Sequence, residues 1–223
     1  MSCITRGAGL RVKTNKCIIV GHGPSIKNVP LERLSYPSFG MNNLKDGFEP
    51  TYYVNLRREH VYRMDAGRGD YKWDIEQIRH GVAVCKEASF IWRGNIPLGL
   101  GDSRTTYMAL ERINMWSDNM DHAFCIGGMT HCAAQIAVML GFTELIMIGM
   151  DGNYRPWKGK DPNHYSEDYS DGFVDYMTEE KAAIINKQHA EMHRLIKYEC
   201  EKRDVKVRYE QLGIRRKPAM EAY

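Results

Sequence analysis

A short apolar run that ends abruptly at two glycines constrains this chain more than any other feature. Residues 17–25 read Cys-Ile-Ile-Val-Gly-His-Gly-Pro-Ser. Such a run is typical of a buried parallel strand, and Gly21 and Gly23 allow a backbone to approach another group closely. We predict that this strand ends at a ligand-binding turn, with free N–H groups and the Ser25 hydroxyl directed at the ligand. A tight turn without a ligand is the alternative.

The turn differs from two well-known phosphate-binding motifs. It has no Gly-Lys-Ser/Thr, so it is not a Walker loop, and Ile26 stands where a dinucleotide fingerprint would have its third glycine. Asn42 and Asn43 occupy the region in which an acidic residue would bind the ribose of NAD. The sequence therefore argues against NAD and leaves amide side chains to read a base or a sugar.

A second strand that ends in glycine lies in the later half of the chain. Residues 123–126 lead into Gly127 and Gly128, an apolar helix follows over 132–140, and residues 145–150 form another buried strand that ends at Asp151. Loops at the carboxyl edge of one parallel sheet lie together, and ligands bind there. We expect residues 21–25 and the loops after 126 and 150 to share a site.

The remaining pattern predicts an α/β fold. It is a Rossmann-like, mostly parallel sheet with helices on both faces, a GT-A-like single nucleotide-binding domain over 1–223. Further strands are expected over 38–42, 50–55, 82–85, 90–92 and 205–209, and helices over 29–34, 56–80, 107–116 and 178–201.

Residues 155–172 are polar and without periodicity, which indicates a lid or substrate loop over about 152–176. His164 in this loop is a candidate general base, because imidazole exchanges a proton near neutral pH. His22 and His131 compete for this role, and Asp151 is expected to orient a base, bind a ribose or cap the loop. Asp161, Asp168 and Asp171 are expected to be solvated. No Asp-x-Asp is placed to bind a metal, so no metal and no cofactor are expected.

Composition places the chain among ordinary globular proteins. It has 223 residues, a net charge of +3 and six cysteines without metal-ligand spacing. The cysteines in apolar runs suit reduced thiols, and neither a signal peptide nor an 18-residue apolar run is present. We expect a cytoplasmic protein, with a homo-oligomer as an open possibility.

These motifs together resemble the bacterial CMP-sialic acid sialyltransferases of glycosyltransferase family 42, and the chain is also similar to the DUF115-like proteins that share the Gly-x-Gly-Pro-Ser start. The resemblance covers about residues 17–56 and 124–170, and it rests on the turn at 21–25, on Asn42, on residues 52–55, and on the run from Gly127 to Asp151. The family's Thr-Ser-Gly is replaced here by Gly-Gly-Met-Thr.

The resemblance implies a nucleotide sugar as donor and a glycan or other hydroxyl compound as acceptor, with modified nucleic acid left open. It implies that nucleotide-binding residues are Gly21, His22, Gly23, Ser25, Asn42, Asn55, Gly127, Gly128, Thr130 and Asn153. Tyr154 and Tyr165 would stabilise the departing phosphate, and His164 would deprotonate the acceptor.

Two other classes of function stay open. Pterin-type pyrophosphokinases resemble the same Gly-x-Gly-Pro-Ser family, and they would need ATP and Mg²⁺. A nucleotide-binding module would bind without turnover.

Overall fold

The structure is a computed structural model. It describes residues 14–42, 44–45, 47–55, 89–93, 105–111, 115–119, 122–124, 128–169 and 176–210. Within these ranges the expected α/β class is confirmed. No described helix is long and apolar enough to cross a membrane.

In the described part of the chain, eight parallel strands form the central sheet, in the order β10-β7-β1-β2-β3-β4-β5-β6. The order reverses at β1, because β2 lies on one side of it and β7 on the other. The strands are β1 (Lys16–Val20), β2 (Ser38–Met41), β3 (Tyr52–Asn55), β4 (Ser89–Arg93), β5 (Thr105–Glu111), β6 (His122–Phe124), β7 (Glu144–Ile148) and β10 (Lys206–Glu210). Val20 pairs with Ile148, so β1 and β7 end at the same level and the loops that follow them start side by side.

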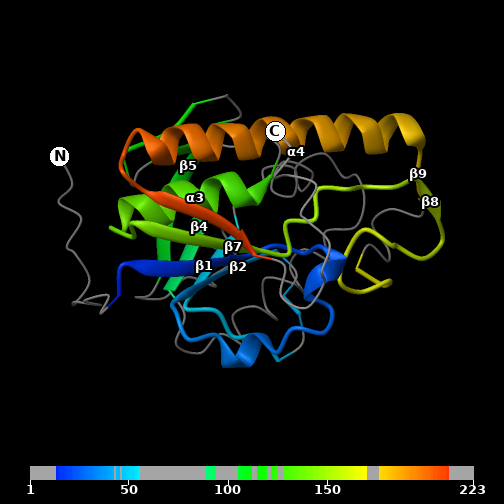
Figure 1. Ribbon diagram of the computed structural model, residues 1–223, viewed down its shortest axis with the longest axis horizontal. Coiled ribbons are helices and arrows are strands. Elements are labelled where there is room, and N and C mark those ends of the chain that lie inside the picture. The colour runs from blue at the N-terminus through cyan, green and yellow to red at the C-terminus, as the bar shows by residue number, and fades with distance from the viewer. Residues whose placement is uncertain are drawn as a thin grey trace.

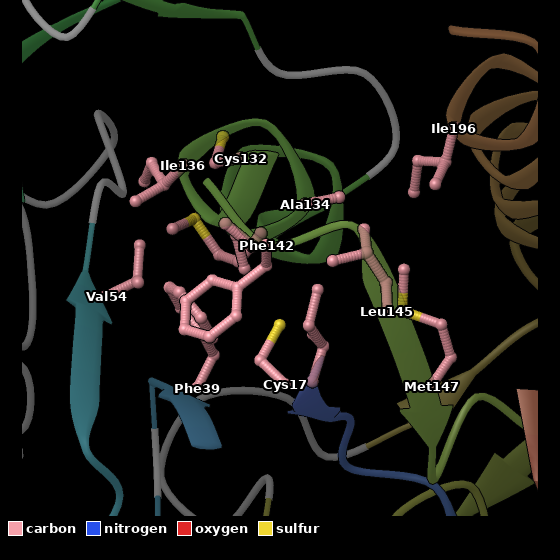
Figure 2. Close-up of a cluster of buried hydrophobic side chains, with 14 of the residues drawn as sticks. Cys17, Phe39, Val54, Cys132, Ala134, Ile136, Phe142, Leu145, Met147 and Ile196 are labelled. Atoms are coloured by element: carbon pink, nitrogen blue, oxygen red, sulfur yellow. The ribbon is translucent and has the colours of Figure 1, made fainter. Parts of the chain in front are cut away.

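Both faces of the sheet are buried, which explains why the central strands are apolar throughout. Along β1, Cys17 and Ile19 belong to a core under the helices, whereas Ile18 and Val20 belong to a second core on the opposite face. Figure 2 shows the first core, where Phe142 lies between the sheet and the helix that carries Ala134. In the described part of the chain, two short 3₁₀ turns, η1 (Pro24–Ile26) and η2 (Leu31–Arg33), cover the second face (Figure 1).

Two helices are stacked on the first face (Figure 1). Helix α3 (Met129–Met139) packs on β1, β2 and β3 and also on α4 (Glu179–Glu201), so it is buried on several sides. Its buried alanines at 133, 134 and 137 let the sheet and α4 approach closely. The side chain of Thr178 accepts a hydrogen bond of 3.2 Å from the N–H of Lys181 and caps α4, as the sequence predicts.

Four expected helices and strands are not seen in the described residues as predicted. The helix expected over 107–116 is wrong, because residues 105–111 form β5 between β4 and β6. Residues 29–34 contain only the 3₁₀ turn η2. The helix expected over 56–80 and the strand over 82–85 lie outside the described residues. Within the expected lid, β8 (Trp157–Lys158) pairs antiparallel with β9 (Tyr176–Met177) just before α4.

Candidate active site

The strand order reverses between β1 and β7, and the two loops that leave these strands therefore meet at a switch point. Ligands of open parallel sheets bind at such points. The loop after β1 is residues 21–25, and the loop after β7 runs from residue 149 through the described part of the expected lid. Most of the candidate residues chosen from the sequence lie on these two loops.

The glycine turn is closed against the loop after β7. The N–H of Gly21 donates to the Ile148 carbonyl at 2.8 Å, and the N–H of Gly23 donates to the Gly149 carbonyl at 2.9 Å. A Cβ atom on Gly23 would lie 1.8 Å from Asp151 Oδ2, and one on Gly21 would lie 2.4 Å from the Gly149 oxygen. The expectation of free N–H groups facing a ligand is therefore wrong for these two residues, which allow the two loops to touch. Nucleotide binding by this turn stays a prediction.

Asp151 caps the glycine turn, which is one of the three roles expected for it. Its Oδ2 atom accepts from the Ser25 N–H at 3.1 Å and from the Ser25 hydroxyl at 2.9 Å. Ser25 is 7% exposed. This pair joins the two loops, and a carboxylate near the sheet keeps hydrogen-bond partners.

In the loop after β7, a buried carboxylate, Asp161, is hydrogen-bonded to the imidazole of His164. Asp161 is 1% exposed, and its Oδ2 atom lies 2.6 Å from Nδ1 of His164. Its other oxygen accepts from the N–H of Asn163 at 2.8 Å. Because the carboxylate accepts, Nδ1 carries the hydrogen, and Nε2 faces the hydroxyl of Tyr154 at 3.4 Å. The expectation that Asp161 is solvated is wrong.

Aromatic rings join this centre to the glycine turn. Tyr169 stacks on His164 with ring centroids 4.1 Å apart and also packs against His22 at 5.2 Å. The N–H of Tyr165 donates to the His22 carbonyl at 2.8 Å, and Nε2 of His22 donates to the carbonyl of Met41 at 2.7 Å. The structure thus brings together His22, Tyr154, His164 and Tyr165, which the sequence singled out.

Helix α4 supplies two residues that sequence reasoning missed. Asn186 accepts from the N–H of Tyr154 at 2.7 Å and donates to its carbonyl at 2.9 Å. The His189 ring packs edge-on against the Tyr154 ring at 5.1 Å. An amide and an imidazole three residues apart, on the helix face that continues through Met192, were the signal available in the sequence.

The N-terminus of α3 lies beside the same group. A Cβ atom on Gly128, the N-cap residue, would lie 3.9 Å from Nε2 of His189 and 3.8 Å from Sδ of Met192. The first turn of α3 carries no acidic side chain. The Thr130 hydroxyl lies 3.7 Å from Sδ of Met150, which is in the loop after β7. Thr130 is therefore close to the loop after β7, as expected, whereas Gly128 is close to α4.

Asn42 directly follows β2 and has an unusual backbone conformation and a buried side chain. Its φ angle is +48°, a left-handed conformation that is rare outside glycine, and the residue is 8% exposed. Its carbonyl accepts from the Tyr53 hydroxyl at 2.7 Å, but its side-chain Oδ1 atom has no hydrogen-bond partner among the described residues. A buried amide oxygen without a partner is costly, and it is a candidate ligand contact.

The remaining candidate residues give little further evidence about the site. His131, considered as a base, is fully buried against Trp116, and burial lowers its pKa to about 4, so it is a core residue. Asn153 is exposed. Gly127 and the side chain of Asn55 lie outside the described residues. Among the described residues, no group of three His, Cys, Asp or Glu side chains is arranged to hold a metal ion.

Comparison with known proteins gives one finding. No protein-family model matches the sequence, and no curated protein matches it. Among solved structures, the fold is similar to that of the monofunctional alpha-2,3-sialyltransferase Cst-I from Campylobacter jejuni. That match has 14% sequence identity and a TM-score of 0.45, and it covers 90% of this chain and 77% of that one.

Proposed function

We propose that this protein is a glycosyltransferase that moves a sugar from a nucleotide-sugar donor to an acceptor hydroxyl without a divalent metal. The observation that carries the proposal is the buried Asp161–His164 pair, which lies in the loop after β7 at the switch point of the sheet. Glycosyl transfer to a hydroxyl needs a group that removes the hydroxyl proton, and an imidazole held by a carboxylate suits this task.

The departing nucleotide phosphate has a matching place at the N-terminus of α3. The first N–H groups of a helix lack intrahelical acceptors, and the helix dipole favours an anion there. Helix α3 begins after Gly128, beside His189, and has no acidic side chain in its first turn. His189 packs on Tyr154. This arrangement would stabilise the leaving phosphate without Mg²⁺.

Asn42 supports a role in reading the nucleotide. Its buried Oδ1 atom would accept a hydrogen bond from a base amino group or a ribose hydroxyl, which would offset the cost of its burial. A donor like CMP-sialic acid and a glycan acceptor belong to the same proposal.

The test is a thermal-shift screen of the purified protein with CMP, UDP, GDP, ADP and their sugar conjugates, with and without EDTA. We expect one nucleotide family to raise the melting temperature, since a ligand that binds only the folded state stabilises it. Mass spectrometry then follows release of free nucleotide from the selected donor, because slow transfer to water reports turnover even without an acceptor.

The outcomes separate the three classes of function. Nucleotide release that persists in EDTA supports the proposal. Turnover only with ATP and Mg²⁺ would favour a pyrophosphokinase, because that chemistry neutralises phosphoryl charge with metal. Binding without turnover, with all donors and candidate acceptors, would leave a nucleotide-binding module.

A further inference from the structure

The imidazole of His164 is enclosed by side chains in this structure. Its Nδ1 atom donates to Asp161 at 2.6 Å, and its Nε2 atom faces the hydroxyl oxygen of Tyr154 at 3.4 Å. Tyr169 stacks on the ring, with 12° between the two planes. Only 14% of the His164 side chain is exposed. An acceptor hydroxyl would have to displace Tyr154 in order to bond to Nε2 directly.

Displacing Tyr154 is costly, because both its backbone and its ring are held in place. The side-chain amide of Asn186 bonds to both the N–H and the carbonyl of Tyr154. The amide of Asn163 holds the next residue, Arg155, in the same way, at 2.8 and 2.9 Å. One side chain from α4 and one from the loop therefore hold the backbone of two consecutive residues, and the tyrosine ring lies edge-on to His164 and His189.

We propose that the acceptor hydroxyl contacts Tyr154, and that its proton reaches His164 through the tyrosine hydroxyl. This inference rests on the proposed function and refines it. Tyr154 becomes the catalytic residue that touches substrate. His164, held by Asp161, acts through Tyr154, and the role of leaving-group stabiliser passes to the N-terminus of α3 and His189.

The proton and electron movements balance. The acceptor O–H bond breaks and its proton moves to the Tyr154 oxygen, while the original Tyr154 proton moves to Nε2 of His164. The acceptor oxygen forms a bond to the anomeric carbon of the donor. The bond from that carbon to the phosphate oxygen breaks, and its electron pair leaves with the nucleotide. The imidazolium that results lies against the Asp161 carboxylate, which stabilises it. The long Tyr154–His164 contact would shorten once substrate is bound, as catalytic hydrogen bonds often do.

The test is a double-mutant cycle on nucleotide release from the donor selected by thermal shift. The proteins are the parent, Tyr154→Phe, His164→Ala and the double variant. If the two residues act in series, each single variant loses about 10²–10⁴-fold in turnover and the double variant loses no more. Tyr198→Phe is the matched control, because Tyr198 is 58% exposed on α4 and its ring lies under Lys202 near the end of that helix. It should keep parental turnover.

A second measurement separates the relay from a merely structural role of His164. Added imidazole should restore turnover to His164→Gly when Tyr154 is present, and it should restore nothing in the His164→Gly, Tyr154→Phe double variant. Losses that multiply in the double variant, or imidazole rescue without Tyr154, would overturn the inference. If the parent releases no nucleotide from any donor, the proposed function itself fails, which is a different result.

Discussion

Each of the two loops at the switch point differs from what its sequence suggests, and the two differ in opposite directions. The glycine turn at 21–25 is typical of a ligand-binding turn in the sequence, yet the Gly21 N–H bonds to the last residue of β7, and the Gly23 N–H and the Ser25 side chain bond to the loop after β7. The irregular loop at 152–169 looks solvated in the sequence, yet it buries Asp161 behind His164.

The difference shows how to interpret each kind of signal. Glycine permits close approach, and here the partner that approaches Gly23 is the Asp151 carboxylate. A polar loop can bury charged groups when each polar atom has a partner, as both oxygens of Asp161 do. The glycine turn is thus packed tightly against β7 and the loop after it, and in our proposal that loop and α4 carry the catalytic residues.

The largest expected effect is a loss of stability when Gly23 is substituted, because this glycine lies where the two loops touch. Because a Cβ atom there would lie 1.8 Å from Asp151 Oδ2 and 2.8 Å from the Gly149 oxygen, we expect Gly23→Ala to lower the free energy of unfolding by about 3 kcal/mol. Gly128→Ala is the control, since its nearest atoms would be 3.8 Å away, and it should cost less than about 1 kcal/mol. Urea denaturation measures both. A Gly23→Ala variant that keeps its stability but loses nucleotide affinity would show a turn held open for ligand.

A smaller expected effect is a dependence of stability on pH that comes from two histidines of the hydrophobic core. Burial lowers the pKa of His131 to about 4 and that of His193 to about 3, compared with 6.5 in an unfolded chain. Below pH 6.5 the unfolded chain takes up protons that the folded protein does not, so stability is lost as pH falls from about 6.5 towards 4. For His131 alone the loss is roughly 2 kcal/mol at pH 5.

Denaturation curves at several pH values test this. His131→Gln should flatten the dependence of unfolding free energy on pH, whatever it does to stability at neutral pH. An unchanged slope would mean that His131 is accessible to protons in the folded state.

Much of the fold follows from local sequence. The apolar runs at 17–20 and 145–148 become β1 and β7, and Thr178 marks the start of α4. A helix is expected over 107–116 because Met108, Ala109 and Leu110 favour helix, whereas pairing with β4 and β6 places these residues in a strand. Thr105, Thr106 and Tyr107 were the opposing signal.

The site was predictable only in part, for a physical reason. His164 could be chosen because it is an imidazole in a polar loop that follows a buried strand, whereas Tyr154 and Tyr165 were chosen from the family resemblance. Asn186 and His189 lie on α4, far along the chain, and their contacts with Tyr154 exist only after α4 packs beside the sheet. The burial of Asp161 could not be predicted, because a spacing of three residues to His164 in an irregular loop does not indicate burial.

The most direct test of the central claim is the protonation state of the His164 ring, observed by NMR of protein labelled with ¹⁵N in histidine. In the neutral ring we predict a hydrogen on Nδ1 and none on Nε2, because Asp161 accepts from Nδ1. The signal is identified by its loss in His164→Gln. Asp161→Asn should change it, and Asp168→Asn should not, since Asp168 pairs with Lys160 at the surface of the same loop. A hydrogen on Nε2 in the parent, or an unchanged signal in Asp161→Asn, would contradict the account.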